Sequence, residues 1–121
     1  MRLGKLIVGS LLLALCCAHA VRAQDWPTRP VTVVVPLPAG TAVDSITRLV
    51  LQQVGQQLGQ SFVVENRPGA GGTLGTNFVA KATPDGYTLL SYGAAASSAA
   101  IYAKLPYDTL ADITPVAARV S

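Results

Sequence analysis

The chain has 121 residues, a formal net charge of +3, two cysteines and one histidine. Three of its nine basic residues, both cysteines and the histidine lie in the first 23 positions, so residues 24–121 carry six acidic and six basic side chains. Balanced, scattered charge of this kind argues against a nucleic-acid partner. Without Cys or His, residues 24–121 have no Cys/His zinc site, no thiol nucleophile, no Ser–His–Asp triad and no disulfide framework. We therefore expect no catalytic residue, no metal and no cofactor.

The first 23 residues have the three-part order of a secretory signal peptide. Residues 1–5 supply two positive charges, residues 6–17 are almost continuously apolar, and residues 18–23 are mostly small. Cleavage is expected after Ala23, and the Ala-His-Ala at 18–20 offers a second position. A membrane anchor is the alternative, but the uncharged stretch here is sixteen residues long, short of the roughly 20 that cross a bilayer. The sequence therefore predicts an exported chain.

After the signal segment, the pattern begins with one strand and one helix. The β-branched run at 31–35, bounded by prolines, predicts a buried strand of a parallel sheet. Thr41 and Asp44 have the Thr-x-x-Asp spacing of a capping box, which opens a helix, and Gly59 is a suitable residue to end it. The inward face of this helix is predicted from apolar residues at three-to-four spacing, namely Ile46, Leu49, Val50, Val54 and Leu58.

The same cycle repeats further along the chain. Residues 61–66 predict a second strand, which a glycine-rich turn at 67–72 follows. Thr73 is expected to cap a second helix that reaches about Ala82, and its inward residues are predicted to be Leu74, Phe78 and Val79.

A third strand is predicted at residues 87–91, followed by a small-residue stretch and irregular structure with short turns. Strand–helix–strand–helix–strand with short connections predicts an α/β fold with a doubly wound parallel sheet. Three parallel strands with both faces to bury form a marginal domain. We therefore expect the chain to be part of a larger lobe.

Ligands of open parallel sheets bind beyond the carboxyl ends of the strands. Three segments follow predicted strands, at residues 36–44, 67–73 and 91–98. Two of them lead into helix N-termini, where unpaired N–H groups and the helix dipole favour an anion. Glycines in these segments allow the backbone to approach a ligand closely. The residues thus predict a site for a small anionic solute, a carboxylate, held by main-chain amides and hydroxyls.

These features also have purely structural interpretations. A glycine-rich turn can serve only to reverse the chain, and Asp44 can serve only as the cap partner at the third helical position. Tyr102 and Tyr107 are interpreted as packing residues. A dinucleotide fingerprint is excluded by spacing, because counting from Gly69 the third glycine, Gly75, comes one residue late, and no P-loop is present.

Five motifs follow one another in order: Trp-Pro-x-Arg-Pro-Val at 26–31, Val-Pro-Leu-Pro-Ala-Gly at 35–40, Glu-Asn-Arg-Pro-Gly-Ala-Gly-Gly at 65–72, Asp-Gly-Tyr-Thr-Leu at 85–89 and Lys-Leu-Pro-Tyr-Asp at 104–108. Together they resemble the Bug receptors, the periplasmic substrate-binding proteins of the tripartite tricarboxylate transporter family. The resemblance implies a two-lobed, flytrap-like binding fold in the periplasm, of which residues 24–121 are a truncated amino-terminal lobe. It also implies a small carboxylate as solute and the membrane subunits of a tripartite tricarboxylate-type transporter as partners.

The resemblance further implies that this lobe contacts the solute largely through backbone amides and bridging waters. The candidate ligand-binding residues are Pro38, Ala39, Gly40, Thr41, Asp44, Ala70, Gly71, Gly72, Thr73, Ser91 and Gly93. Thr41 departs from the family pattern by replacing the second glycine of Pro-Ala-Gly-Gly, and it is expected to narrow the pocket or add a hydroxyl. Residues 94–100 lack the usual His and Asn-Pro, and Ser98 stands near the position of that Asn.

The alternative function is an exported α/β enzyme fragment that acts on a small anionic substrate through an Asp or Lys mechanism. The missing His and Cys argue against it. Family members are more than twice as long as this chain, and a flytrap clasps its solute between two lobes. We therefore expect the 121-residue form to retain only part of the contacts and to bind its solute with millimolar or weaker affinity.

Overall fold

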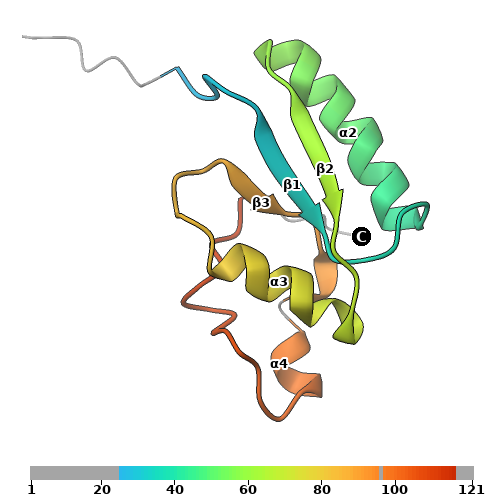
Figure 1. Cartoon of the computed structure of the whole chain (residues 1–121), viewed down its shortest axis with the longest axis vertical. Helices are drawn as coiled ribbons and strands as arrows, with labels where there is room; N and C mark the ends of the chain where they lie inside the picture. Colours follow the sequence, from blue (N-terminus) through green and yellow to red (C-terminus); the bar gives the residue numbers. More distant parts are fainter. Residues whose placement is uncertain (1–24, 96, 117–121) are drawn as a thin grey trace, which may run out of the picture.

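The computed structural model describes residues 25–95 and 97–116 (Figure 1). The predicted signal peptide and its cleavage after Ala23 lie outside the described residues. The strands are β1 (Val31–Val35), β2 (Phe62–Asn66) and β3 (Thr88–Leu90). The helices are α2 (Ala42–Leu58), η1 (Ala70–Gly72), α3 (Thr73–Ala80), η2 (Gly93–Ala95) and α4 (Ser98–Ile101).

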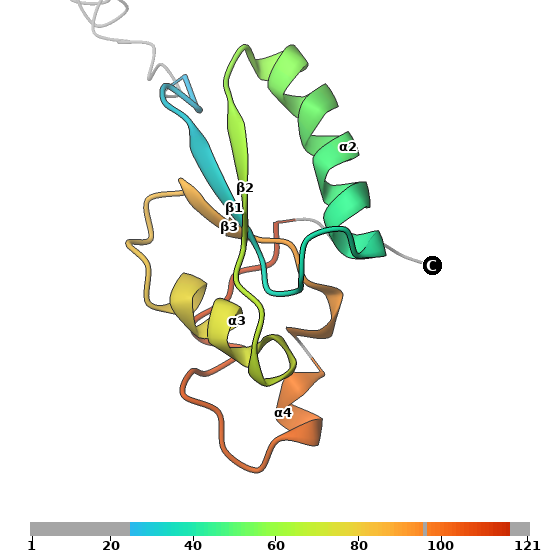
Figure 2. The ribbon, with the colours of Figure 1, turned by 45° about the vertical axis from the view of Figure 1, so that its right-hand side comes forward.

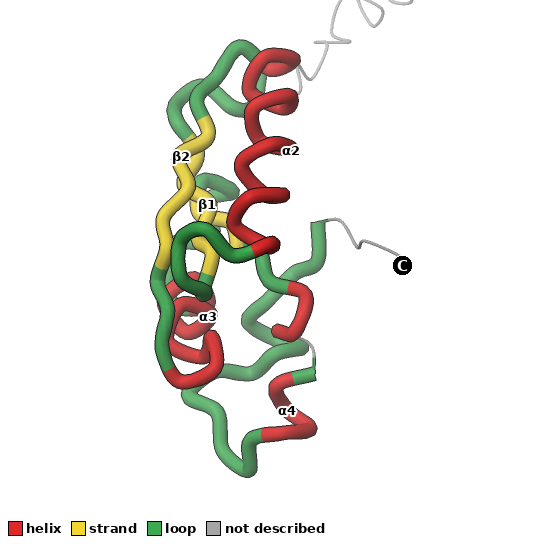
Figure 3. Tube along the Cα trace, turned by 90° about the vertical axis from the view of Figure 1, so that its right-hand side faces the viewer, coloured by secondary structure: helices red, strands yellow, loops and turns green. Residues whose placement is uncertain are grey.

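The three strands form one parallel sheet in the order β2-β1-β3, so the central strand is the first in the sequence. Val31 of β1 is paired with Phe62 of β2, and Val33 with Leu89 of β3. The chain passes outward from β1 to β2 and then back across β1 to β3. Because these two connections run in opposite directions, right-handed crossovers place α2 and α3 on opposite sides of the sheet (Figures 2 and 3). The predicted α/β class and doubly wound parallel sheet are confirmed.

The ends of α2 follow the predicted signals. Thr41 is the N-cap, and its hydroxyl accepts a hydrogen bond from the backbone N–H of Asp44. Gly59 ends the helix with φ 65°, in the left-handed region that glycine adopts without a Cβ penalty, and its N–H bonds to the Gly55 carbonyl. In both cases the hydrogen-bond donor and its acceptor lie close together in the sequence, so the sequence alone predicts where the helix begins and ends.

The predicted inward face of α2 is wrong for four of its five residues, while the fifth, Val54, is half-buried. Ile46, Leu49, Val50 and Leu58 are exposed, by 43%, 65%, 54% and 43%, whereas the polar Asp44 and Thr47 are buried. The Asp44 carboxylate and the Thr47 hydroxyl both find hydrogen-bond partners on other segments. A buried polar group is tolerated once it is paired, so these contacts allow α2 to bury Asp44 and Thr47.

The helix α3 also differs from its prediction. Gly72, at φ 90°, is its N-cap, and Thr73 is instead the first helical residue, with its hydroxyl donating to the Ala70 carbonyl at 2.8 Å. Leu74 and Phe78 are exposed, while the buried positions are Thr73, Gly75 and Thr76. The small residues face the sheet because α3 approaches it closely, and the longer apolar side chains are thereby turned outward.

The strand β3 is shorter than the predicted segment 87–91, and the chain after it forms short helical turns before an irregular stretch. The buried apolar residues of the described chain are mainly those of β1, with Ala95 and Tyr107. Among the helices that the structure describes, none has the length and apolar character of a membrane span.

Candidate functional site

The segments that follow the three strands meet at one edge of the sheet. The N–H of Arg67, just after β2, donates to the Val35 carbonyl at 2.9 Å, and the N–H of Ser91, just after β3, donates to the Val34 carbonyl at 2.9 Å. These bonds align the carboxyl ends of β2 and β3 with the carboxyl end of β1. In Figure 1 the arrows of β1 and β2 point to the same edge of the sheet. We call the segments the first loop (residues 36–41), the glycine loop (residues 69–72) and the third segment (residues 91–95).

The first loop is held by one buried carboxylate. Asp44 is only 3% exposed, and its Oδ2 accepts from the Gly40 N–H at 2.9 Å. Its Oδ1 accepts from the Asn66 side-chain amide at 2.9 Å, and both oxygens lie within 3.2 Å of Arg48 Nε. Asn66 also donates to the Leu37 carbonyl at 3.1 Å and accepts from Arg48 Nη2 at 3.0 Å. This network joins the first loop, α2 and the end of β2.

The same network determines the acidity of Asp44. The Gly40 backbone N–H, the Arg48 side chain and the Asn66 amide stabilise the ionised carboxylate and lower its pKa from 3.8 to about 2, against the smaller opposing effect of burial. Arg48 lies near the site, but its charge is directed at Asp44. Attraction for an anion at this edge of the sheet must therefore come mainly from backbone N–H groups and the N-terminus of α2.

A lowered pKa in the folded state means that ionised Asp44 stabilises the fold at neutral pH. That contribution is complete above the unfolded-state pKa and is lost as the pH falls through the folded-state pKa, between about pH 4 and pH 2. We expect the difference in unfolding free energy between the wild-type chain and Asp44→Asn to shrink across this window, as measured by urea unfolding at several pH values. A difference that stays constant from pH 5 to about pH 2 would contradict this role of Asp44.

Two candidate hydroxyls are already engaged within the protein. Thr41 Oγ1 donates to the Pro38 carbonyl at 3.0 Å while it accepts from the Asp44 N–H at 3.4 Å. Ser91 Oγ lies 2.7 Å from Thr47 Oγ1, which ties the third segment to α2. Thr41 therefore acts as the helix cap, and Ser91 as a link between β3 and α2.

The glycine loop has an unusual backbone. Four successive residues have positive φ angles, 133° at Gly69, 47° at Ala70, 63° at Gly71 and 90° at Gly72. The hydroxyls of Tyr92 and Tyr102 donate to carbonyls of this loop.

Three residues at the site were not predicted from the sequence. Tyr92 was given no role, Tyr102 was interpreted as a packing residue, and Asn66 was overlooked. The position of Asn66 within the Glu-Asn-Arg-Pro-Gly motif was the available signal.

The candidate residues differ in how far they reach solvent. Pro38, Ala39, Gly40, Ala70, Gly71 and Gly93 are exposed, Thr41 and Ser91 are half-buried, and Asp44, Gly72 and Thr73 are buried. The strand ends thus bring together the three predicted segments and leave backbone from each of them open to solvent. In residues 25–95 and 97–116 there is no group of three or more acidic, Cys or His side chains that is placed to hold a metal ion.

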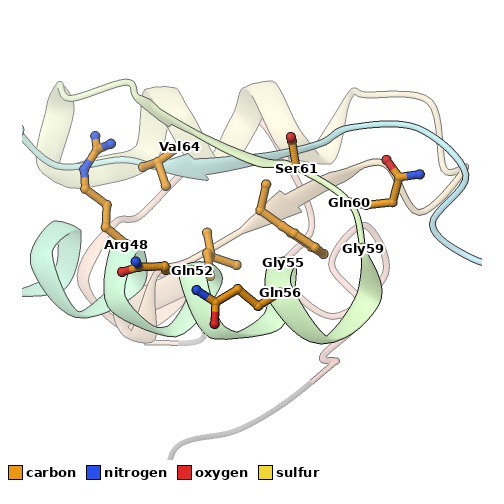
Figure 4. Close-up of a pocket in the computed structure, with 10 residues that line it drawn as sticks. Arg48, Gln52, Gly55, Gln56, Gly59, Gln60, Ser61 and Val64 are labelled. Carbon is orange, nitrogen blue, oxygen red and sulfur yellow. The ribbon is translucent and has the colours of Figure 1, made fainter.

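Two hollows lie away from this edge. One, of about 630 Å³, runs between α2 and β2, and Figure 4 shows Gln52 and Gln56 of α2 and Gln60 and Val64 around it. The other, of about 580 Å³, lies between residues 99 and 112. None of the candidate ligand-binding residues lines either hollow. Neither of these two hollows is therefore the candidate site, which the segments at the strand ends form.

Known proteins share both the sequence and the fold of this chain. A UPF0065 protein of Bordetella bronchiseptica is 46% identical over 114 residues, which are 93% of this chain and 34% of that protein. The solved structure of MatC from Rhodopseudomonas palustris with bound malate is 44% identical, with a TM-score of 0.66 over 75% of this chain and 32% of MatC. The periplasmic binding protein BugD is 49% identical, with a TM-score of 0.52 over 54% of this chain and 22% of BugD.

The chain spans about a third of the length of the curated relatives that it matches. The family model described as "Tripartite tricarboxylate transporter family receptor" matches residues 46–121, which include the end of β2, the glycine loop and the third segment. The resemblance to the Bug receptors is thereby confirmed. On this match and on the shared fold, the chain belongs to the receptor family of the tripartite tricarboxylate transporters.

Proposed function

We propose that this chain forms the amino-terminal lobe of a periplasmic receptor that binds a small carboxylate and delivers it to the membrane subunits of a tripartite tricarboxylate-type transporter. Residues 1–23 then act as the signal peptide, with cleavage after Ala23, and residues 24–121 form the lobe. Membership of a receptor family supports binding without chemical conversion of the solute. The solved relatives support the compartment and the solute class, since BugD is described as a periplasmic binding protein and MatC is described with bound malate.

The observation that carries this proposal is the meeting of three backbone segments at the carboxyl edge of the sheet. The first loop leads outward from β1 to β2 and the glycine loop leads back across β1 to β3, so these two connections run in different directions, and ligands of doubly wound sheets bind at such places. In the proposal, the exposed backbone N–H groups of Ala39, Ala70, Gly71 and Gly93 face one carboxylate. Pro38 and Gly40 shape the first loop, whose Gly40 N–H donates to Asp44, and Asp44, Thr41 and Ser91 hold the segments in place. Gly72 and Thr73 contribute by starting α3 behind the glycine loop.

A second lobe would supply the opposite wall of the site. One open surface buries only part of a small solute, whereas ligand sites usually enclose most of it. Large apolar side chains that remain exposed on α2 and α3, such as Leu49 and Leu74, support a larger protein around this lobe. The proposal therefore predicts weak binding by the chain itself.

Titration of the ¹⁵N-labelled chain with malate tests the function. We expect a millimolar or weaker dissociation constant and amide shift changes concentrated in residues 38–42, 70–73 and 91–93, because these segments provide the anion-facing backbone. Malamide is the matched control, since it keeps the size of malate but lacks its charge, and it should leave these amides unshifted. Micromolar binding would contradict a one-lobe site, and shifts concentrated around Gln52 and Gln56 would place the ligand elsewhere.

A further inference from the structure

One residue of the glycine loop, Ala70, adopts a backbone conformation that it does not favour. All four of its residues have φ angles between 47° and 133°, and one of them, Ala70, carries a Cβ. A non-glycine residue persists in the left-handed region only where its surroundings hold it there. Contacts from outside the loop must therefore stabilise this conformation.

Side-chain hydroxyls provide those contacts at three successive carbonyls. Ala70 O accepts from Thr73 Oγ1 at 2.8 Å and from the Tyr102 hydroxyl at 3.4 Å. Gly71 O accepts from the Tyr92 hydroxyl at 2.7 Å, and Gly72 O accepts from Thr76 Oγ1 at 2.8 Å. Two of the donors lie on α3, while Tyr92 and Tyr102 reach the loop from beyond β3, more than 20 residues along the chain.

The two tyrosines also occupy the space beside the loop. A Cβ on Gly72 would come within 2.8 Å of the Tyr92 ring, and a Cβ on Gly71 would collide with the Tyr102 hydroxyl. Glycine at these two positions therefore serves the approach of the tyrosines as well as the positive φ. The loop and the aromatic side chains fit together as one unit.

Fixing a carbonyl also fixes the amide that shares its peptide plane. In a trans peptide the N–H points away from the C=O, so holding the Ala70 carbonyl toward Tyr102 turns the Gly71 N–H to the opposite side. The next N–H, that of Gly72, is engaged with the Gly69 carbonyl at 3.0 Å. The Gly71 amide, on an exposed residue, is thus directed away from Tyr102, while Tyr92 holds the following peptide plane, that of the Gly71 carbonyl and the Gly72 N–H.

We propose that Tyr92 and Tyr102 are positioning residues, which use their hydroxyls to hold the glycine loop in the conformation that presents the Gly71 N–H to a carboxylate. This inference rests on the proposed function and names the residues that prepare its site. Tyr92 lies in the third segment and Tyr102 follows α4, so both reach the glycine loop from beyond β3.

The test replaces each tyrosine by phenylalanine, which keeps the ring and removes only the hydroxyl. We expect Tyr92→Phe to weaken malate binding about fivefold, the effect of losing one typical neutral hydrogen bond. Tyr102→Phe should weaken it about twofold, because its hydrogen bond is longer and Thr73 still holds the same carbonyl. Tyr107→Phe is the matched control, since the buried Tyr107 hydroxyl has no hydrogen-bond partner among the described residues; it should change neither binding nor the glycine loop.

NMR relaxation dispersion of residues 69–72 without ligand separates positioning from general destabilisation. If the hydroxyls hold the loop, Tyr92→Phe raises conformational exchange in these residues alone. The dissociation constant should then rise by the inverse of the fraction of molecules in which the loop keeps its wild-type conformation. Unchanged loop exchange, or malate binding equal to wild type in both tyrosine variants, would overturn the inference. If the wild-type chain binds no malate, the proposed function fails, while the loop exchange still decides whether the tyrosines hold the loop.

Discussion

Replacing Gly75 by alanine is expected to lower the unfolding free energy of the chain by about 1–3 kcal/mol, the usual cost of overpacking a close contact. A Cβ on Gly75 would lie 2.7 Å from the Arg67 carbonyl oxygen and 2.7 Å from Cβ of Pro36. Neither neighbour is the end of a flexible side chain, so α3 would have to move away from the sheet. This cost should outweigh the gain of about 1 kcal/mol that alanine has over glycine inside a helix.

Thermal unfolding monitored by circular dichroism measures this effect, with a fall in Tm of about 4–8 °C for each kcal/mol lost. Gly93→Ala is the control, because no atom lies within 4 Å of the Cβ that it would add, and its Tm should match that of the wild type. A Gly75→Ala variant as stable as Gly93→Ala would show that α3 does not depend on this close approach.

Replacing Asn66 by alanine is expected to lower the unfolding free energy by about 1.5–3 kcal/mol, the range for a hydrogen bond that involves a charged group. The side chain donates to the Asp44 carboxylate and to the Leu37 carbonyl, and it accepts from Arg48. Its loss would leave Asp44 Oδ1 with Arg48 Nε but without the shorter hydrogen bond from Asn66, and it would release the first loop from the end of β2. We therefore also expect faster hydrogen exchange at Gly40.

Urea unfolding measures the change in stability, and Asn77→Ala is the matched control. Asn77 is half-buried on α3, and its Oδ1 lacks a hydrogen-bond partner among the described residues. Its removal should therefore leave the unfolding free energy nearly unchanged. If the two variants lose the same stability, the network around Asp44 does not hold the first loop.

The elements of the fold were predictable where their signals lie close together in the chain. Thr41 accepts the hydrogen bond from Asp44 that a capping box requires, and Gly59 ends α2 as predicted. One partner differs: the Asp44 carboxylate binds the N–H of Gly40, whereas the Thr41 N–H bonds to the Pro38 carbonyl. The tight turn of the first loop produces this shift by one residue.

The faces of the helices were not predictable from apolar spacing. The pattern favoured Ile46 and Val50 as inward residues, yet α2 buries Asp44 and Thr47 in their place. Thr47 bonds to Ser91, which is 44 residues further along the chain. The spacing of apolar residues indicates which face of a helix would gain most from burial. It contains no information about polar partners on distant segments, so it predicted the wrong face of α2.

The candidate site was predictable as a set of segments and not as a set of contacts. The strand order brings the residues after β1, β2 and β3 to one edge, as the alternation of strands and helices implied. Asn66 and Tyr92 were missed because their roles depend on carbonyl groups of Leu37 and Gly71, 29 and 21 residues away. Tyr92 lies in no motif, and the motif that contains Asn66 does not identify the groups that its side chain binds.

By itself, the sequence determined the order of strands and helices, the cap and end of α2, the parallel sheet and the receptor family, since these depend on neighbouring residues or on motifs read in order. Only the tertiary structure decided which sides of α2 and α3 face the sheet, which polar groups are buried, and how the glycine loop is held. The physical reason is the reach of the interactions. Caps and turns are closed by groups three or four residues apart, whereas each of these outcomes depends on a hydrogen bond or close approach between segments that the fold must first bring together.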